Sequence, residues 1–459
     1  MPWLALPVLV SGVFLVVLDF FIVNVAMPSM QQDLGSTTGQ LEWVVAGYGL
    51  SLASLLLTAG RLGDQFGRRR MYVSGVAVFT LSSMVCAVAV SPETLIAARV
   101  AQGLGAAMIL PSMLSLIGVL FQGPDRARAI SVYGMAMGLA GAGGQIIGGT
   151  LIEADLFDVG WRLIFAINIP IGITILILAP RFIPESKAAL TTKLDPLGLI
   201  LMTLTVTALV VLPIEGRQAG WPLWTWGVLA ASGMLLAATV RQQRDLARRG
   251  GDPLFPPALV KVATFRIGLA VQLTYWCGQA SFYLFLALYL QQGQGLSALE
   301  SGLMFSILAT AYLATSLKAP DLVTTRGRSL VTLGAATVAS GYGALFAALD
   351  AGVGAHVMLL APGLLLIGAG QGLCITPLAS IVLAHADPTQ AGAVSGALST
   401  SQQVGNCIGV ATIGVVYFAT HPSISAAFGW SLVPLAIISL LVIALSRWLP
   451  YPPRETELA

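Results

Sequence analysis

The stretch VVLDFFIVNVAMP, residues 16–28, closes an apolar run that begins at residue 4. A helix of about 20 apolar residues crosses the hydrocarbon core of a bilayer, which is about 30 Å thick. The run is therefore expected to form a transmembrane helix. A charged side chain at the centre of such a helix costs roughly 2.5–3.5 kcal/mol on insertion scales. Asp19 is therefore expected to be paired, protonated or in contact with a wet cavity.

Apolar runs of this length recur along the whole chain. Its 459 residues are 56% hydrophobic and only 9% charged, whereas a soluble domain is roughly 25% charged. We expect helices over 4–28, 41–60, 71–91, 94–120, 128–152, 161–180, 195–214, 222–240, 264–290, 299–319, 329–349, 354–384, 390–419 and 424–449. The predicted fold class is all-α, a polytopic membrane protein with 14 transmembrane helices.

The connections between these runs differ in charge. Those after even-numbered spans are basic, as at 61–70 and 241–249, whereas those after odd-numbered spans are acidic or neutral, with Asp33 and Glu42 in the first. Cytoplasmic loops carry an excess of Lys and Arg, so the basic connections and both termini are expected in the cytoplasm. Arginine far outnumbers lysine, which favours a bacterial cytoplasmic (inner) membrane.

The chain also contains an internal repeat. QGLGAAMILP at 102–111 is echoed by GQGLCITP at 370–377, and GRLGDQFGRRR at 60–70 has a weaker counterpart at 319–329. Paired halves with a site between them are typical of secondary transporters. We expect two six-helix halves, residues 1–187 and 251–459, separated by an inserted two-helix segment at 188–250.

Four motifs give the chain a family resemblance. They are LDFFIVNVAMP at 18–28, GRLGDQFGRRR at 60–70, RVAQGLGAAMILP at 99–111 and WRLIFAINIPIG at 161–172. In this order, and on these spans, the chain resembles the fourteen-helix drug:proton antiporter branch of the major facilitator superfamily over essentially its whole length. The resemblance implies the major facilitator fold and proton-coupled efflux of lipophilic small molecules, such as drugs, antibiotics or toxic organics, by alternating access.

One motif of this branch departs from the family pattern. In AGAGGQIIGGT at 140–150, a glutamine stands where the family carries proline. The stretch is still expected to be a helix-packing and antiporter motif, because small residues let helices approach closely in lipid. Its residues are Gly141, Gly144, Gln145, Gly148 and Gly149. The departure leaves open an importer, or a lipid or metabolite exporter, on the same fold with a different coupling mode.

Asp19, Arg99 and Gln102 are the expected proton-coupling residues. Burial favours the neutral form of a carboxyl and a nearby cation favours the charged form, so a group that moves between such surroundings loads and unloads a proton. At a rise of about 1.5 Å per residue, Asp19 lies roughly 13 Å and Arg99 roughly 7 Å from the same end of the bundle. Gln102 shares Arg99's helix face. A structural role for Asp19, or an Arg99 that extends outward, is the alternative.

The segment at 60–70 is expected to act as a gate. Its glycines permit a tight turn, and its acid can pair with a basic residue or cap a helix N-terminus. A role in membrane orientation alone is the alternative, and both roles are compatible. The predicted gating residues are Gly60, Arg61, Gly63, Asp64, Gly67, Arg68 and Arg69.

Polar and aromatic stripes on three spans predict the substrate cavity. Amide side chains do not face lipid, so these stripes are expected to face protein or a cavity. Aromatic faces with a few amides suit a lipophilic, partly polar molecule, here neutral, zwitterionic or monocationic. Hydrogen bonding between helices without ligand contact is the alternative. The residues are Asn24, Gln272, Trp276, Gln279, Tyr283, Gln402, Gln403 and Asn406.

Other classes of protein are disfavoured. The sequence has no phosphate-binding loop, no clustered metal ligands and no nucleophile constellation, so an enzyme, a cofactor and a nucleic-acid partner are not expected. A membrane sensor would need a soluble output domain, and the segments between the spans are too short for one. The expected partners are a small-molecule substrate, protons and the lipid bilayer, with the proton gradient as energy source and a monomer as the working unit.

Overall fold

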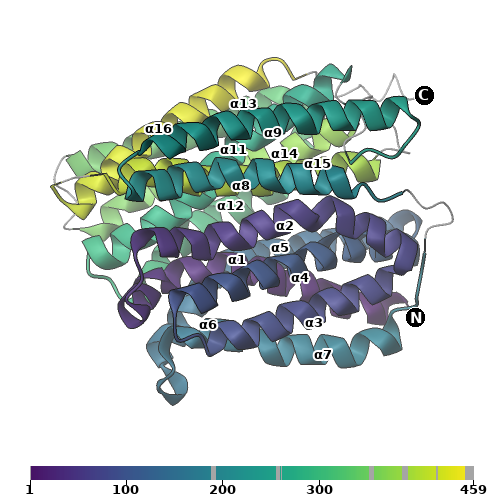
Figure 1. Ribbon diagram of the computed structural model, residues 1–459. Helices are drawn as coiled ribbons and strands as arrows, with labels where there is room; N and C mark the ends of the chain where they lie inside the picture. Colours follow the sequence, from purple (N-terminus) through teal and green to yellow (C-terminus); the bar gives the residue numbers. More distant parts are fainter. Residues whose placement is uncertain are drawn as a thin grey trace. The chain divides into compact units, whose positions relative to one another are not determined.

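The computed structural model describes residues 2–187, 193–254, 259, 261–350, 356–384, 391–419 and 422–449, and no strand occurs among them. The chain divides into two compact units, Met1–Leu254, called unit 1 below, and Phe255–Ala459, called unit 2. The predicted start of the inserted segment at 188 lies outside the described residues. Figure 1 shows both units as bundles of long helices.

Unit 1 contains the helices of the first half and of the inserted segment. They are α1 (Pro2–Leu34), α2 (Thr38–Phe66), α3 (Arg68–Ala87), α4 (Pro92–Leu120), α5 (Gly123–Ala154), α6 (Leu163–Ala166), α7 (Asn168–Phe182), α8 (Pro196–Gln218) and α9 (Leu223–Arg248), with the 3₁₀ turns η1 (Leu156–Asp158) and η2 (Gly160–Arg162) before α6.

Unit 2 contains the remaining described helices. They are α11 (Ala263–Leu288), α12 (Ala298–Arg326), α13 (Arg328–Asp350), α14 (Ala361–Ala384), α15 (Ala391–Tyr417) and α16 (Ile424–Ser446), with the π turn η3 (Tyr289–Gly293) and the 3₁₀ turn η5 (Val357–Leu360). Each apolar run expected from the sequence overlaps a described helix, and the run at 161–180 is divided among η2, α6 and α7.

The number of membrane spans is 11 among the described helices, or 12 when the bent pair Arg128–Gly141 and Gly143–Ala154 counts as one span. The predicted count of fourteen is not confirmed. α11 and α15 are long enough to cross a bilayer but are not among these spans. Both carry the predicted amide stripes, and the amides lower their mean hydropathy. The chain is a multi-pass helical membrane protein.

Local signals in the sequence define several helix starts. Thr37 and Gln40 form a reciprocal capping box at the start of α2, and Ser91 caps α4 immediately before Pro92. Such caps satisfy backbone N–H groups that have no partner within the helix. Between α2 and α3, Gly67 has a φ of 118°, which a residue with a side chain rarely adopts.

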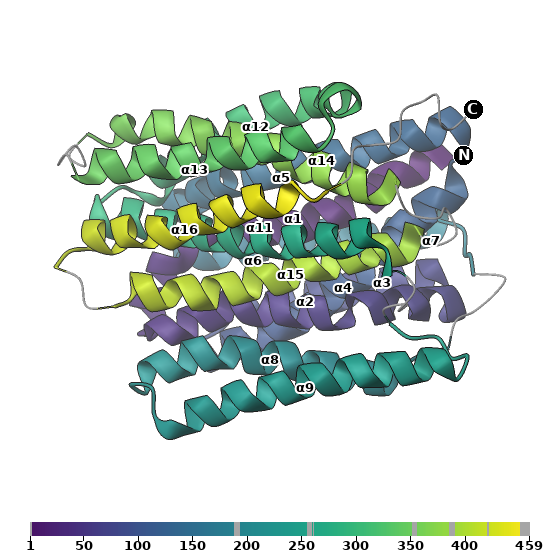
Figure 2. The ribbon, with the colours of Figure 1, turned by 90° about the horizontal axis from the view of Figure 1, so that it is seen from above.

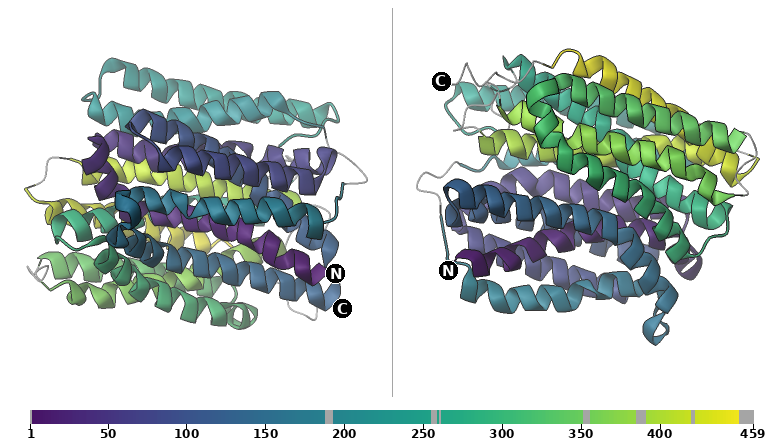
Figure 3. Two further views of the ribbon diagram at one scale, coloured as in Figure 1. Left: turned by 90° about the horizontal axis from the view of Figure 1, so that it is seen from below. Right: turned by 180° about the vertical axis from the view of Figure 1, so that it is seen from behind.

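Each unit packs around its own apolar core. In unit 1, α4 packs against α2 and α3, and α1 packs against α5 and α7. The inserted helices α8 and α9 lie side by side as an antiparallel pair, and α8 packs against α2 (Figures 2 and 3). In unit 2, α14 packs against α12 and α13, whereas α11 packs against α15 and α16. The insert therefore belongs to the first unit.

The structure corrects one sequence expectation about α2. Glu42 was counted with the acidic connection before α2, although the predicted span 41–60 includes it; it lies inside α2 and none of its side chain is exposed. Because the helix begins at Thr38, the acid falls in its second turn and points into protein. Asp19 is thus not the only acid buried within a span.

Candidate functional site

The centre of unit 1 is a polar cluster around Asp19, whose side chain is 0% exposed. Arg99 donates from Nη1 to Asp19 Oδ2, and the two residues form an ion pair between α1 and α4. Gln102 donates from Nε2 to Asp19 Oδ1 at 2.8 Å and accepts from Arg99 Nη1 at 2.7 Å. The three predicted coupling residues therefore meet directly.

The guanidinium of Arg99 makes further contacts inside unit 1. Its Nε donates to the Val44 carbonyl at 3.1 Å, and its side chain is 1% exposed. The guanidinium carbon lies 4.2 Å from the centre of the Tyr48 ring, where an aromatic face attracts a cation. Arg99 does not extend outward, so the alternative based on snorkelling does not apply in this conformation.

Two further residues complete the cluster, and the sequence did not predict them. Asn168, the first residue of α7, donates to Asp19 Oδ1 at 2.9 Å. Ser83 on α3 accepts from Gln102 Nε2 at 2.9 Å. The signal for Asn168 was an isolated amide in the apolar run of the WRLIFAINIPIG motif. Asp19 thus accepts three hydrogen bonds and donates none, which is the pattern of an ionised carboxylate.

The predicted glycine stripe of α5 packs against α1 next to Asp19. A Cβ at Gly144 would lie 3.2 Å from Phe21 Cβ and 3.4 Å from the Leu18 carbonyl oxygen. Gly141 faces the Phe21 ring and Gly148 faces Ile22, also on α1. The stripe therefore lets α5 approach the helix that carries the acid.

A larger side chain at Gly144 is expected to separate α5 from α1. Gly144→Val should lower the free energy of unfolding by about 1–3 kcal/mol, as overpacking usually does. Gly134→Val in the same helix is the matched control, because a Cβ there meets nothing within 4 Å. Thermal unfolding in detergent measures both, and equal stability of the two variants would contradict the packing role.

Gln145 is buried, with 1% of its surface exposed. Neither its side-chain nitrogen nor its oxygen has a hydrogen-bond partner among the described residues. α5 bends by 41° between Gly141 and Gly143, shortly before this residue. Small residues permit such a bend, although the proline of the family is absent.

The 60–70 segment holds its charges in local pairs. Asp64 pairs with Arg68 at 2.8 Å, one helix turn away across Gly67. The backbone N–H of Arg69 donates to Glu185 at 3.1 Å, and Arg69 Nη1 donates to the Ile183 carbonyl at 3.1 Å. The turn is therefore fixed to the chain that follows α7.

Arg61 has a different set of partners. Its guanidinium donates to the carbonyls of Lys193 at 2.9 Å, Asp252 at 2.7 Å and Pro253 at 2.5 Å. These carbonyls precede α8 and follow α9. Arg61 therefore attaches both ends of the inserted pair to α2.

The predicted cavity residues are divided between the units. Asn24 lies in unit 1, where Nδ2 donates to the Phe21 carbonyl at 3.2 Å. The others lie in unit 2, where α11 and α15 pack against each other. Trp276 Nε1 and Asn406 Oδ1 are buried without a hydrogen-bond partner among the described residues, and such atoms are suited to bind a ligand.

Gln279 and Tyr283 instead take part in contacts within unit 2. Tyr283 donates to Gln371 Oε1 at 3.0 Å, and Gln279 Nε2 approaches the Tyr283 hydroxyl at 3.5 Å. Gln402 and Gln403 are partly buried, and Gln403 accepts from Asn406 at 3.5 Å. The Tyr283–Gln371 contact joins α11 to α14 and favours hydrogen bonding between helices for that residue, whereas the other two contacts lie within one helix.

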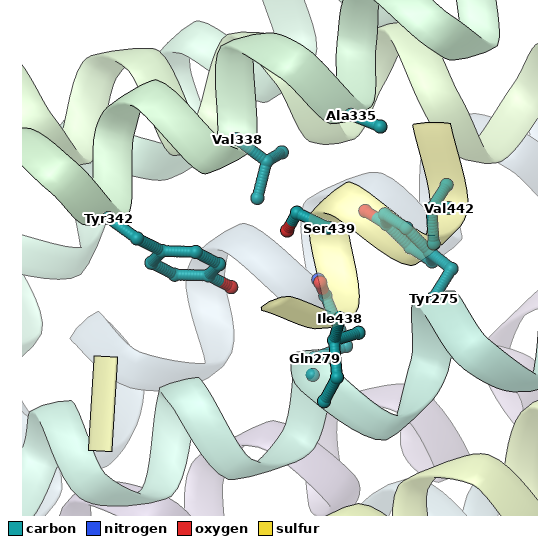
Figure 4. A pocket seen from close by; sticks show the side chains of 9 residues that line it. Tyr275, Gln279, Ala335, Val338, Tyr342, Ile438, Ser439 and Val442 are labelled. Carbon is teal, nitrogen blue, oxygen red and sulfur yellow. The ribbon is translucent and has the colours of Figure 1, made fainter. Parts of the chain in front are cut away.

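A small cavity lies where α11, α13 and α16 meet. Figure 4 shows Tyr275, Gln279, Tyr342 and Ser439 directed toward it. Its volume is about 10 Å³, enough for about one water molecule. An open groove of about 310 Å³ lies between α1 and α7. It is lined by Pro7, Val8, Ser11, Pro170, Ile171, Thr174, Ile175 and Leu178.

The two units differ at the position of the ion pair. Gln102 on α4 corresponds in the repeat to Gln371 on α14, and Arg99 corresponds to Gly368. A Cβ at Gly368 would lie within 3.0 Å of the Leu308 backbone, so no side chain fits there. Unit 2 therefore has a neutral cluster where unit 1 has a charged one.

Two helical units in a membrane, one with a buried carboxylate–arginine pair, are features of secondary transporters. The chain matches the Major Facilitator Superfamily over residues 9–410 and belongs to that family. It is a transporter and not an enzyme.

Several relatives have names that refer to export. The chain is 36% identical over 418 residues to the "Probable actinorhodin transporter" of Streptomyces coelicolor, covering 91% of this chain and 72% of that protein. It is 35% identical over 456 residues to the "Cephamycin export protein CmcT" of Amycolatopsis lactamdurans, covering 96% and 91%. It is 32% identical over 416 residues to the "Multidrug resistance protein Stp" of Mycobacterium tuberculosis, covering 89% and 74%.

Solved structures share the fold. A D-xylose-proton symporter aligns with a TM-score of 0.70 at 15% identity and covers 99% of both chains. A POT family transporter in complex with 5-aminolevulinic acid aligns with a TM-score of 0.71 at 14% identity and covers 96% of both. At this identity the likeness concerns the fold alone.

Proposed function

We propose that this protein exports lipophilic small molecules across a bacterial inner membrane in exchange for protons, by alternating access. The observation that carries the proposal is the Asp19–Arg99 pair, enclosed in unit 1. Taking two charges out of water is costly, and an ionisable residue inside a membrane span is by default functional. The names of the relatives support export of drugs or antibiotics.

In the proposed cycle, a proton binds to the Asp19 carboxylate and neutralises it. Gln102 and Asn168 can still donate to Oδ1, so protonation removes chiefly the attraction to Arg99. A buried cation that loses its counter-charge is strongly destabilised. The movement of Arg99 toward a wetter position then displaces α4 from α1, and loss of the proton restores the pair.

The glycine stripe and the 60–70 segment have supporting roles in this proposal. Close packing through Gly144 and Gly148 couples α5 to any movement of α1. The Asp64–Arg68 pair and the Glu185 contact act as the gate on the cytoplasmic side, which the basic loops identify.

Buried, unpartnered groups in unit 2 support a site for the substrate. Trp276 offers an N–H donor and Asn406 a carbonyl acceptor, and neither is charged. Such a site favours neutral, zwitterionic or monocationic molecules with an aromatic face. One chain suffices for the cycle, and the driving energy is the pH gradient plus about 2.3 kcal/mol per charge per 100 mV of membrane potential.

Transport in everted membrane vesicles tests the proposal. With an acidic interior, addition of a transported compound to an antiporter should discharge the pH gradient, because protons leave as substrate enters. Actinorhodin and cephamycin, taken from the names of relatives, are the first compounds to test, alongside a growth-inhibition panel in an efflux-deficient host.

An importer, or a lipid or metabolite exporter with another coupling mode, is the second candidate. The unpartnered Gln145 in place of the family's proline favours it. Growth protection without substrate-induced discharge of the gradient would support an exporter with another coupling mode, whereas increased sensitivity without discharge would support an importer; either result would overturn proton exchange.

A further inference from the structure

Glu42 on α2 forms a second buried contact between an acid and an arginine in unit 1. Its side chain is 0% exposed, and its Oε2 accepts from Arg217 Nη2 at 2.9 Å. Arg217 belongs to α8 of the inserted pair and is 13% exposed. The insert thus contributes a cation to an acid of the first half.

The two buried acids differ in how their oxygens are satisfied. Both oxygens of Asp19 accept hydrogen bonds, from Arg99 on one side and from Gln102 and Asn168 on the other. Oε1 of Glu42 has no hydrogen-bond partner among the described residues. A bare carboxylate oxygen in a dry site is costly. A proton on Oε1 removes the negative charge, which is the larger part of that cost, and leaves Oε2 available to Arg217.

On the described helices around Glu42, the other charged side chains are acids, are paired elsewhere or lie far along their helix, so they do not neutralise its carboxylate. On α8, Glu215 is an acid and accepts from Trp43 Nε1 at 2.7 Å. On α4, Glu93 accepts from Gln40, and Arg99 donates to Asp19. On α1, Asp19 and Asp33 are acids, and Asp33 pairs with Arg162. The basic residues of α3, at 68–70, lie next to the end of α2, whereas Glu42 lies near its start.

The inserted pair is attached to α2 at both ends. Near the start of α2, Arg217 and Glu215 bind Glu42 and Trp43. Near its end, Arg61 donates to carbonyls that precede α8 and follow α9. Because both attachments involve α2, Arg217 should remain beside Glu42 whenever unit 1 moves as a body.

We propose that Glu42 is a second proton-binding site, neutral in this conformation, and that the inserted helix pair supplies its counter-ion through Arg217. On release, the O–H bond at Oε1 breaks, the proton passes to water near the start of α2, and the carboxylate formed pairs with Arg217. Binding of the proton is independent of the proposed function, whereas its use in transport rests on it.

Infrared spectroscopy of the purified protein tests this site. At about pH 6, where exposed carboxylates are ionised, wild type should show the carbonyl stretch of a protonated carboxylic acid. Glu42→Gln should remove this band, Asp19→Asn should leave it, and Arg217→Gln should leave or strengthen it, because a cation favours the ionised form. Glu42→Asp, which keeps an acid, should shift the band.

Absence of the band in wild type, or its persistence in folded Glu42→Gln, would overturn the site. Glu42→Asp provides the decision if Glu42→Gln does not fold, since an unshifted band would then come from another acid. Substrate-induced discharge in vesicles is measured on the same preparations. Normal discharge without the band refutes only this site, whereas the band without discharge refutes only the proposed exchange.

Discussion

Asp19→Asn is expected to abolish substrate-driven discharge of the pH gradient, at least about tenfold below wild type, which is a loss of about 1.4 kcal/mol or more of transition-state stabilisation. The amide of asparagine does not ionise in this pH range, so it cannot alternate between a charged and a neutral form. Its oxygen can still accept from Gln102 and Asn168, which helps the cluster to keep its shape. Fluorescence quenching in everted vesicles measures the effect, and growth inhibition gives a second readout.

Asp33→Asn is the matched control, because Asp33 lies on the same helix but is 45% exposed in its pair with Arg162. We expect discharge in this variant to remain near that of wild type. Undiminished discharge by folded Asp19→Asn would refute the coupling role of Asp19. A similar loss in both variants would instead indicate a general effect of altering α1.

A contact between two helices could be predicted from the sequence where it required only that both residues lie at a similar depth in the membrane. The rise per residue placed Asp19 and Arg99 within reach of each other from the same end of the bundle, and they form an ion pair. Asn168 was not predicted, because helix packing and not depth brings the start of α7 to Asp19. The family resemblance included the motif around Asn168 without giving this residue a role.

The charge pattern of the connections gave a misleading prediction for Glu42. Acidic residues near the end of a span fit the orientation rule, so Glu42 was counted with the connection although it falls at the start of the predicted span 41–60. Within the helix, Glu42 is buried, and its partner Arg217 comes from α8, which packs on α2. No periodicity within α2 reveals a partner 175 positions later in the chain.

The helices were easier to predict from the sequence than the membrane spans. The apolar runs overlap the long helices in the described part of the chain, yet α11 and α15 are not among the spans identified by length and apolar composition. Their amides, such as Gln272 and Asn406, were the reason to place the cavity there, and the same amides lower the hydropathy of these helices. For a helix that turns a polar face into a bundle, the sequence therefore predicts the helix correctly but does not identify it as a membrane span.

Arg99→Leu is expected to lower the free energy of unfolding by about 3–5 kcal/mol, since removing one partner of a buried ion pair leaves the other charge uncompensated. Leucine fills part of the space against the Tyr48 ring, so most of the expected loss of stability comes from the missing charge and little from the missing volume. Arg162→Leu is the control. Its pair with Asp33 is partly exposed, with side chains 23% and 45% accessible, and exposed pairs contribute about 0–1 kcal/mol.

The double variant Asp19→Asn with Arg99→Leu separates charge from packing. Replacing a whole buried pair by neutral groups is often close to neutral in stability, so the double variant should be more stable than Arg99→Leu alone. Chemical or thermal unfolding in detergent is measured for wild type, Asp19→Asn, Arg99→Leu and the double variant, which together form a double-mutant cycle. If the two substitutions add without coupling, the pair is not an energetic unit, and the proposed release of Arg99 on protonation of Asp19 loses its driving force.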